Sequence, residues 1–210
     1  MLWGLTGCSG TGSSTVAAVW QDLGAKVCSL DRAGHNYLGK LPVKRALEIE
    51  LGMSGLSGMP SDKIRYVLRD IAFTSPEILA GINSVLHPRL SRWVAFSSEK
   101  LKNKEGIFVL DGALIFELGL EKCFDYLVTV TDELDRVTNR LVARDGISID
   151  TVAGRWESQI SLKEKKFRSH FEIHNSGTEL ELKKKAELFY KDVIQRMEDP
   201  DGTQNKKETN

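Results

Sequence analysis

Apolar positions along the 210-residue chain follow two periods that alternate from end to end. Five short apolar runs have the length and composition of buried β-strands. They lie at residues 3–5, 26–30, 107–112, 126–131 and 171–174. The stretches between them carry apolar residues at helical spacing. Strands that alternate with helices form βαβ units, so the pattern predicts a three-layer α/β domain with a five-stranded parallel sheet flanked by helices.

Proline and glycine set the expected helix boundaries between the second and third strands. Pro42 and Gly52 bound one helix, since proline suits a first helical turn and glycine a C-terminus. Ser75 and Pro76 open another helix, which we expect to end near residues 87–88. Pro88 then starts a separate helix that runs to about residue 101. Later in the chain, Asp132 is expected to cap a helix over 133–143, and a charge-rich helical block covers 148–169.

The first strand runs into a glycine-rich loop. Residues 7–14 read Gly-Cys-Ser-Gly-Thr-Gly-Ser-Ser, which fits G-x-x-x-x-G-K-[ST] except that Ser13 stands at the lysine position. A strand, such a loop and a helix start let backbone N–H groups cradle phosphates. The alternative is that the glycines only make a tight turn. We expect a nucleotide triphosphate to be bound by Gly10, Thr11, Gly12, Ser13, Ser14 and Thr15, with the Ser14 hydroxyl on Mg²⁺.

Two aspartates follow apolar strands, at the end of the sheet where open parallel sheets bind ligands. Asp111 is placed to hold Mg²⁺, or else is a turn residue before Gly112. Asp31 could accept a proton from a hydroxyl nucleophile, or else cap the following helix. His35 lies on that helix and is expected to touch the substrate.

Charge is balanced overall but uneven locally. Lys plus Arg and Asp plus Glu both number 29, which argues against a general nucleic-acid or membrane binder. Residues 136–168 nevertheless carry eight basic and four acidic residues. Arg140 and Arg144 are four apart and share a helix face, which suits a clamp over a transferred phosphoryl group. The alternative is an ordinary solvated helical face.

Cysteine usage is typical of a cytoplasmic protein. The three cysteines lack metal or disulfide spacing and are expected to be free thiols. We expect no signal peptide, because the N-terminus is a strand that enters the glycine loop. No apolar run approaches the roughly 20 residues of a membrane span.

Motifs spread from residue 4 to about 194 resemble one known family. The specific elements are His87-Pro88, Leu-Ile-Phe-Glu at 114–117 and Arg-Leu-x-x-Arg-Asp-Gly at 140–146, in this order. They accompany the loop at 4–15, Leu30-Asp31 with His35, residues 63–73 with Pro76, residues 83–86, Leu110-Asp111, Asp125, residues 147–148, Arg155 with Gln159, and Ile-His-Asn-Ser-Gly at 173–177. With these motifs the chain resembles the dephospho-coenzyme A kinases.

The resemblance implies a P-loop kinase fold with three kinds of region. These are a nucleotide-binding core (1–31, 106–135 and 171–197), a helical substrate region (32–105) and a lid (136–170). The polar residues 198–210 are expected to form a disordered tail. The implied reaction moves the γ-phosphoryl group of ATP to the 3′-hydroxyl of dephospho-coenzyme A, with Mg²⁺. The implied protein is a cytoplasmic monomer or small homo-oligomer that acts on small molecules.

The resemblance also implies roles for single residues. Asp31 would be the base or a substrate contact, and Asn175 would lie near the adenine. Arg140 and Arg144 match the lid arginines. The substrate-side positions are matched by Arg65, His87 and Glu117.

Four departures from the family pattern bear on activity. Ser13 replaces the loop lysine, Ser29 replaces the first aspartate of Asp-Ala-Asp, residues 112–113 replace an Ile-Pro pair, and His174 stands where aspartate is common. Loss of one preorganised electrostatic donor typically costs about 10²–10³ in rate. Two hypotheses follow: a kinase in which another cation meets the charge, or a catalytically weak nucleotide-binding homologue with a regulatory role.

Overall fold

The computed structural model describes residues 1–72 and 75–198, so the expected disordered tail falls almost entirely outside the described residues, as does Phe73 of the family motifs. Within that range the sheet has the strand order β2-β3-β1-β4-β5, and every neighbouring pair is parallel. This confirms the predicted five-stranded parallel sheet. The strands are β1 (Leu2–Gly7), β2 (Lys26–Ser29), β3 (Phe108–Asp111), β4 (Tyr126–Thr131) and β5 (Phe171–His174).

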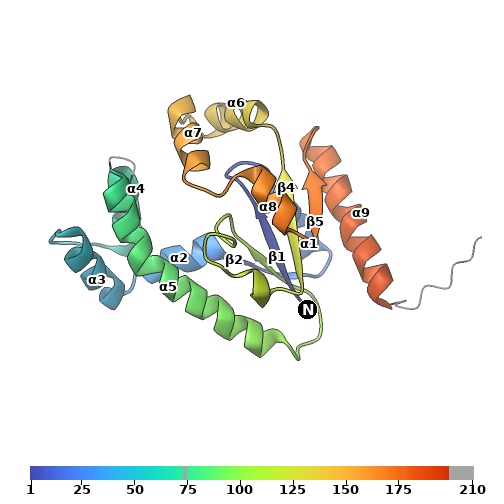
Figure 1. Cartoon of the computed structure of the whole chain (residues 1–210), viewed down its shortest axis with the longest axis horizontal. Helices are drawn as coiled ribbons and strands as arrows, with labels where there is room; N and C mark the ends of the chain where they lie inside the picture. The colour runs from blue at the N-terminus through green and yellow to red at the C-terminus, as the bar shows by residue number, and fades with distance from the viewer. Residues whose placement is uncertain (73–74, 199–210) are drawn as a thin grey trace, which may run out of the picture.

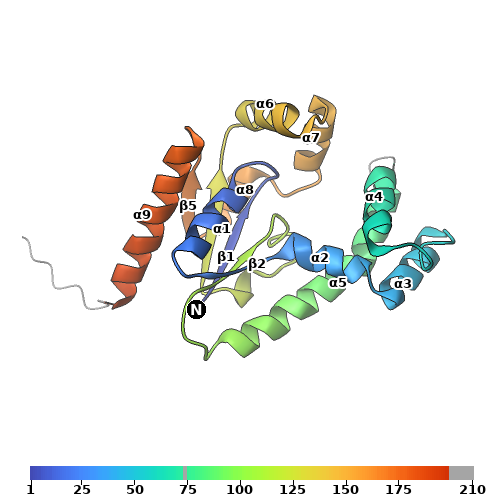
Figure 2. The ribbon, with the colours of Figure 1, turned by 180° about the vertical axis from the view of Figure 1, so that it is seen from behind.

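Helices cover both faces of this sheet (Figures 1 and 2). Helices α1 (Ser13–Asp22) and α9 (Glu179–Glu198) pack together on one face. Helices α5 (Pro76–Leu101) and α8 (Leu162–Arg168) lie on the other face, with the 3-10 helix η1 (Glu121–Cys123). The remaining helices are α2 (Leu30–Leu38), α3 (Leu41–Leu51), α4 (Ser61–Ala72), α6 (Leu134–Asp145) and α7 (Ile149–Glu157).

Strand β1 divides its side chains between two cores, as a strand buried on both faces must. Trp3 packs with α1 and α9, while Leu2 packs with the cluster beneath α5. Trp3 is fully buried, and its ring meets Trp20 edge-on at 5.5 Å between centroids. Truncating such a tryptophan to alanine typically costs about 3–5 kcal/mol, so this contact anchors the layer that carries α1.

The long helix α5 corrects one prediction. We expected a break near Pro88, but a single helix runs from Pro76 to Leu101 with Pro88 inside it. Proline removes one helical N–H and usually breaks a helix. Here Ile82 and Val85 pack into one apolar cluster before Pro88, whereas Leu90 and Val94 pack into another cluster after it. Packing on both sides outweighs the local cost.

Two other expectations need correction. Asp132 does not cap the helix that follows it, because the N-cap of α6 is Glu133, without a side-chain cap. The Asp132 carboxylate instead pairs with Arg136 and Arg140. The helical block expected over 148–169 is two helices, α7 and α8, separated near Gln159.

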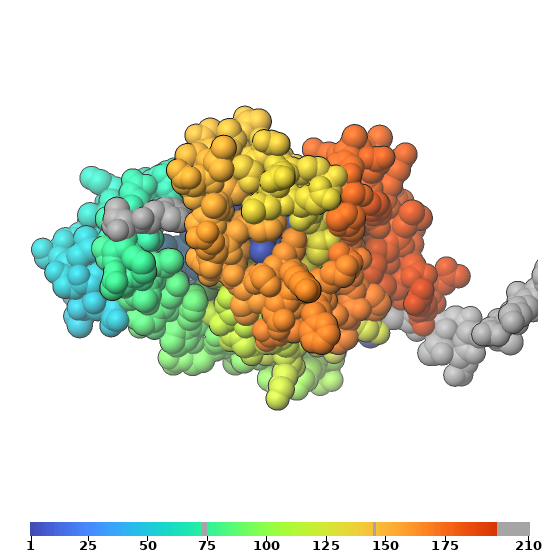
Figure 3. All heavy atoms as spheres, turned by 45° about the horizontal axis from the view of Figure 1, so that its top comes forward, coloured from blue at the N-terminus to red at the C-terminus, as the bar shows by residue number. Residues whose placement is uncertain are grey.

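We call residues 136–170 the lid segment: its first part, with most of α6 and all of α7, lies above the carboxyl end of the sheet, whereas α8 packs against the sheet itself (Figure 1). Helices α6 and α7 share a small core made by Val137, Leu141 and Val152. Figure 3 looks onto this segment, and blue atoms of the N-terminal part of the chain show through a gap among its yellow and orange atoms. Among the described residues, no helix combines the length and apolarity needed to cross a membrane.

Candidate active site

The glycine loop between β1 and α1 is held tightly by its surroundings. Gly10 and Gly12 have φ angles of +86° and +107°, in the left-handed region that favours glycine. A Cβ atom on Gly10 would lie 2.7 Å from Leu141 of α6, and one on Gly12 would lie 2.9 Å from the Asn175 side chain. Larger residues at either position would therefore deform the loop.

Helix α1 presents an open N-terminus to this loop. Its N-cap is Gly12, and no side chain in the described structure caps it. Ser13, Ser14 and Thr15 form the first turn and line the adjacent cavity. Uncapped N–H groups and the positive end of the helix dipole favour an anion here. The glycine loop therefore has the geometry that a phosphate site requires.

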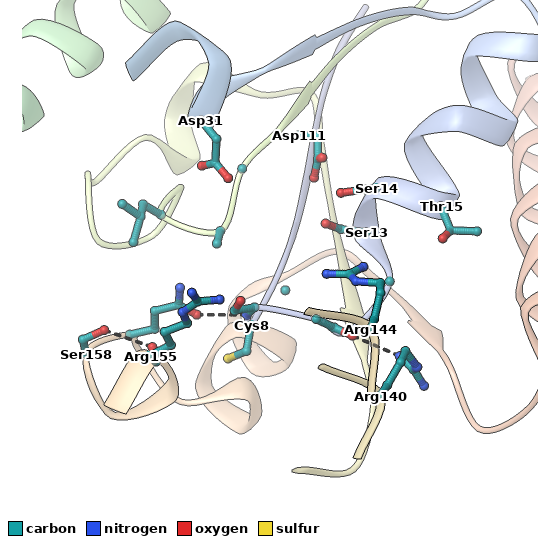
Figure 4. Close-up of a pocket in the computed structure, with 18 of the residues that line it drawn as sticks. Cys8, Ser13, Ser14, Thr15, Asp31, Asp111, Arg140, Arg144, Arg155 and Ser158 are labelled. Carbon is teal, nitrogen blue, oxygen red and sulfur yellow. Dashed lines mark hydrogen bonds between the residues drawn. The ribbon is translucent and has the colours of Figure 1, made fainter. Parts of the chain in front are cut away.

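A cavity of about 1130 Å³ opens over the loop and is walled on one side by the lid segment (Figure 4). Among the described residues that line it, the long basic side chains are all arginines, and none is a lysine. These are Arg65, Arg69, Arg140, Arg144 and Arg155. Guanidinium groups bind phosphate oxygens in bidentate fashion, so this lining suits a polyphosphate.

Asp111 lies at the end of β3, as predicted, and faces Ser13 (Figure 4). Its register partners are Leu5 of β1 and Ser29 of β2, so it stands between the glycine loop and the start of α2. Burial raises the pKa of Asp111 to about 6, the hydroxyl of Ser13 beside it lowers that pKa, and the nearby Asp31 raises it. A half-buried carboxylate with this pKa is short of compensating positive charge.

Asp31 also faces the cavity, but from a helix rather than a strand end. Strand β2 ends at Ser29, and Asp31 lies in the first turn of α2. The alternative that Asp31 caps α2 is wrong, because the Ser29 hydroxyl takes that role by accepting from Arg32 N at 3.3 Å. Burial raises the pKa of Asp31, and His35 opposes that shift.

The helical region contributes basic and polar groups to the same cavity. His35 and Arg65 line it, as expected. Burial lowers the pKa of His35, with a further lowering by Arg65 and an opposing effect of Asp31. Arg69 and Asn83 line it too and were not predicted. Arg69 could have been found, because it follows Arg65 by one helical turn and shares its face.

His87 lines a smaller adjoining cavity of about 250 Å³ between α2, α4 and α5. Several residues line both cavities, among them His35, Arg65 and Asn83. The buried His87 Nε2 atom has no hydrogen-bond partner within the described structure. Burial lowers the pKa of His87, and Glu117 opposes that shift. The imidazole is therefore biased towards its neutral form.

Glu117, expected on the substrate side, lies beneath the lid segment and is not among the cavity-lining residues. Its Oε1 atom accepts from Ile160 N at 2.8 Å and pairs with Lys165 at 2.9 Å. Lys165 is fully buried and also donates to the Ala113 carbonyl. Glu117 thus ties the segment after β3 to the lid segment.

The two predicted lid arginines occupy different settings. Arg140 pairs with Asp132 at 2.7 Å and donates to the Gly10 carbonyl at 3.0 Å. The Asp132 side chain is fully buried and is shared with Arg136, so it fixes the position of the Arg140 guanidinium against the loop. Arg144 and Arg155 point into the cavity from opposite sides, Arg144 beside Ser13 and Arg155 beside Cys8 (Figure 4). Arg155 belonged to the family motif but was not predicted as a site residue.

Thr11 and Asn175 stand behind the loop. Thr11 is fully buried, and its hydroxyl donates to the Cys8 carbonyl at 3.0 Å. The Asn175 amide donates to the Thr11 carbonyl at 2.8 Å. Burial also raises the pKa of the Cys8 thiol to about 11, so the thiol stays protonated near neutral pH.

Comparison with known proteins agrees with this geometry. The dephospho-CoA kinase family model matches residues 1–181. A dephospho-CoA kinase of Aquifex aeolicus is 29% identical over 191 residues, which cover 90% of this chain and 96% of that protein.

Two solved structures share the fold over nearly their whole length. The crystal structure of TT1252 from Thermus thermophilus has a TM-score of 0.72 and 28% identity, covering 94% of this chain and 97% of that one. A dephospho-CoA kinase from Campylobacter jejuni has a TM-score of 0.65 and 24% identity, covering 95% and 98%, which supports the fold alone. With a family model that matches most of its length, the chain belongs to the dephospho-CoA kinase family.

Proposed function

We propose that the protein transfers the γ-phosphoryl group of ATP to the 3′-hydroxyl of dephospho-coenzyme A, giving coenzyme A and ADP. Family membership supports the reaction. The observation that carries it for this chain is one arginine-lined cavity, with the open N-terminus of α1 on one side and Asp31 on the other. Such a cavity has a place for the phosphates and a base for the acceptor.

The nucleotide phosphates bind at the glycine loop and the first turn of α1. Backbone N–H groups of Gly10, Gly12, Ser13 and Ser14 supply donors at the positive end of the helix dipole, whereas the Thr15 N–H donates to the Gly12 carbonyl and Thr15 lines the cavity. Support comes from the absence of a side-chain cap on α1 in the described structure. Thr11 and Asn175 act indirectly, because their side chains bind loop carbonyls.

Magnesium fits the oxygen donors at Asp111 and Ser14. Both residues line the cavity, and the half-buried Asp111 carboxylate has a raised pKa, which a bound cation would lower. Among the described residues, no group of three or more His, Cys, Asp or Glu could hold a metal. Mg²⁺ is commonly held by one or two carboxylates together with substrate phosphates, so these two residues suffice. When bound, it neutralises charge on the β and γ phosphates.

Asp31 orients the acceptor and takes its proton. The 3′-oxygen forms a bond to the γ-phosphorus as the bond from that phosphorus to the β–γ bridging oxygen breaks, and the hydroxyl proton passes to the Asp31 carboxylate. Support comes from its place in the cavity and from its raised pKa, which brings its basicity closer to the working pH.

Positive charge over the transferred group comes from Arg144, with Arg155 on the other side of the cavity. Arg140 lines the same cavity, where its guanidinium group is tied to Asp132 and to the Gly10 carbonyl. On the acceptor side, His35 and Arg65 contact the substrate within the large cavity, and His87 does so in the adjoining one. Glu117 supports this wall from behind.

The alternative, a nucleotide-binding homologue with little turnover, is not favoured. Asp31, Asp111, Ser14 and two cavity-facing arginines are gathered in one cavity, which nucleotide binding alone does not require. A coupled assay with ATP, Mg²⁺ and dephospho-coenzyme A tests the proposal, with ADP and coenzyme A both quantified. ATP binding without formation of coenzyme A would favour the alternative.

We further propose that the protein works in the cytoplasm on small molecules, without nucleic acid, as a monomer or small homo-oligomer. The metabolic role of the family supports this setting. Light scattering coupled to size-exclusion chromatography measures the oligomeric state.

A further inference from the structure

Four successive carbonyl groups of the glycine loop each accept a hydrogen bond from a side chain. The donors come from the loop itself, from both helices at the start of the lid segment and from the end of β5. The bonds run from Thr11 Oγ1 to Cys8 O (3.0 Å), from Trp156 Nε1 to Ser9 O (2.9 Å), from Arg140 Nη1 to Gly10 O (3.0 Å) and from Asn175 Nδ2 to Thr11 O (2.8 Å).

This pattern fixes the direction of the peptide groups. A phosphate loop works when its N–H groups point towards the anion, so its carbonyls must find partners elsewhere. Donors already in place spare the loop from reorganising when the ligand arrives. Because Ser13 brings no ammonium group, the loop N–H groups carry a larger share of phosphate binding in this chain.

Two of the four donors connect the loop to the lid segment. Trp156 lies on α7 and its ring packs against the small core of α6 and α7. Arg140 lies on α6. Gln159 adds a third contact, because its Oε1 atom accepts from Ser9 N at 3.3 Å. A displacement of α6 and α7 would break these bonds, so loop shape and lid position are linked.

We propose that Trp156 is a positioning residue that holds the Ser9 carbonyl away from the cavity and couples order in the phosphate loop to the position of the lid segment. Together, the side chains that donate hydrogen bonds to the carbonyls of residues 8–11 order the loop around the phosphates. This inference rests on the proposed function for the identity of its ligand, ATP.

The test compares Trp156→Phe with Trp93→Phe. The first variant keeps an aromatic ring in the small core but loses the N–H donor. Trp93 lies on α5 and packs in a different core cluster, so it controls for loss of one indole. Hydrogen–deuterium exchange of a peptide covering residues 7–15 reports loop order, and calorimetry without acceptor reports ATP affinity. Trp156→Phe should speed loop exchange and weaken ATP binding by about 3- to 10-fold, the range for one hydrogen bond.

A kinetic split separates positioning from general damage. Trp156→Phe should raise KM for ATP while KM for dephospho-coenzyme A stays near the wild-type value. If Trp156→Phe does not fold, Thr11→Val takes its place in the test. This variant removes another side-chain donor to a loop carbonyl with little change of shape, and it should also speed loop exchange.

The proposal would be overturned if Trp156→Phe showed the same loop exchange and the same ATP affinity as the Trp93→Phe control. If Trp156→Phe does not fold, unchanged loop exchange in Thr11→Val would overturn it instead. Failure of the proposed function looks different. If the wild-type protein binds ATP but makes no coenzyme A, the proposed activity is refuted. The exchange and affinity measurements would still test the role of Trp156 in ordering the loop.

Discussion

Ser13 faces the carboxylate of Asp111 and lowers its pKa, so the residue at the loop-lysine position lies beside the carboxylate we assign to magnesium (Figure 4). The Ser13 hydroxyl carries no charge, so it does not neutralise this carboxylate. Burial and Asp31 therefore keep the pKa of Asp111 high. This pair shows what the site lacks in charge when serine replaces the lysine.

Ser13→Lys should fold and should either tighten ATP binding or raise turnover. An ammonium group at position 13 would reach the nucleotide phosphates, as the loop motif provides. It would also lower the pKa of Asp111 as an added nearby cation, so the acid limb of the rate profile should move to lower pH. Steady-state kinetics over a pH series measures both effects, with Ser13→Met as an uncharged control. A fall in both ATP affinity and turnover for Ser13→Lys would mean that the site is adapted to serine.

Asp111→Asn should make the protein more stable at neutral pH and remove magnesium-dependent turnover. The pKa of Asp111 is raised in the folded state from 3.8 to about 6. The folded state therefore binds this proton more tightly, and that contribution to stability is complete below pH 4 and is lost as pH rises through about 6. Above pH 6 the ionised group costs up to about 3 kcal/mol.

Urea unfolding of both proteins at pH 7.5 and at pH 4 checks this prediction. The gain in the free energy of unfolding from Asp111→Asn should be seen at pH 7.5 and be much smaller at pH 4. Equal stability of the two proteins at pH 7.5 would show that Asp111 is better compensated than its burial indicates.

Asp31→Asn should reduce kcat by roughly 10²–10⁴ with little change in ATP affinity, because the amide cannot take the hydroxyl proton. Ser29→Ala is the matched control, since it removes the cap of α2 two residues away. That control should cost about 1 kcal/mol of stability and leave kcat near wild type. If Asp31→Asn behaves like Ser29→Ala, Asp31 has a structural role in α2 only.

The sheet was predictable because buried parallel strands are short, continuous apolar runs, which need no knowledge of their neighbours. The course of α5 was not. Pro88 predicts a break from local chemistry, and only the two clusters that pack before and after it explain why the helix continues.

The site was predictable where strand topology alone positions a residue. Asp111 and the glycine loop follow neighbouring strands and meet for that reason. Glu117 and Thr11 were expected at the ligand but point elsewhere, because Lys165 and the Cys8 carbonyl hold them. Such directions depend on tertiary partners that the sequence does not reveal.

Arg144→Ala should lose more kcat than ground-state ATP affinity, because the charge that Arg144 meets is greatest in the transition state. Arg136→Ala is the control: it removes the same charge from the same helix, but Arg136 pairs with Asp132 and is not a cavity-lining residue.

Kinase lids close over nucleotide to exclude water, so ATP and Mg²⁺ should slow protease cleavage between Gly146 and Lys166. Cleavage at the same rate with and without nucleotide, together with a fully active Arg144→Ala, would contradict the role we assign to the lid segment. A loss of kcat restricted to Arg144→Ala would instead identify Arg144 as a cation that compensates for the missing lysine.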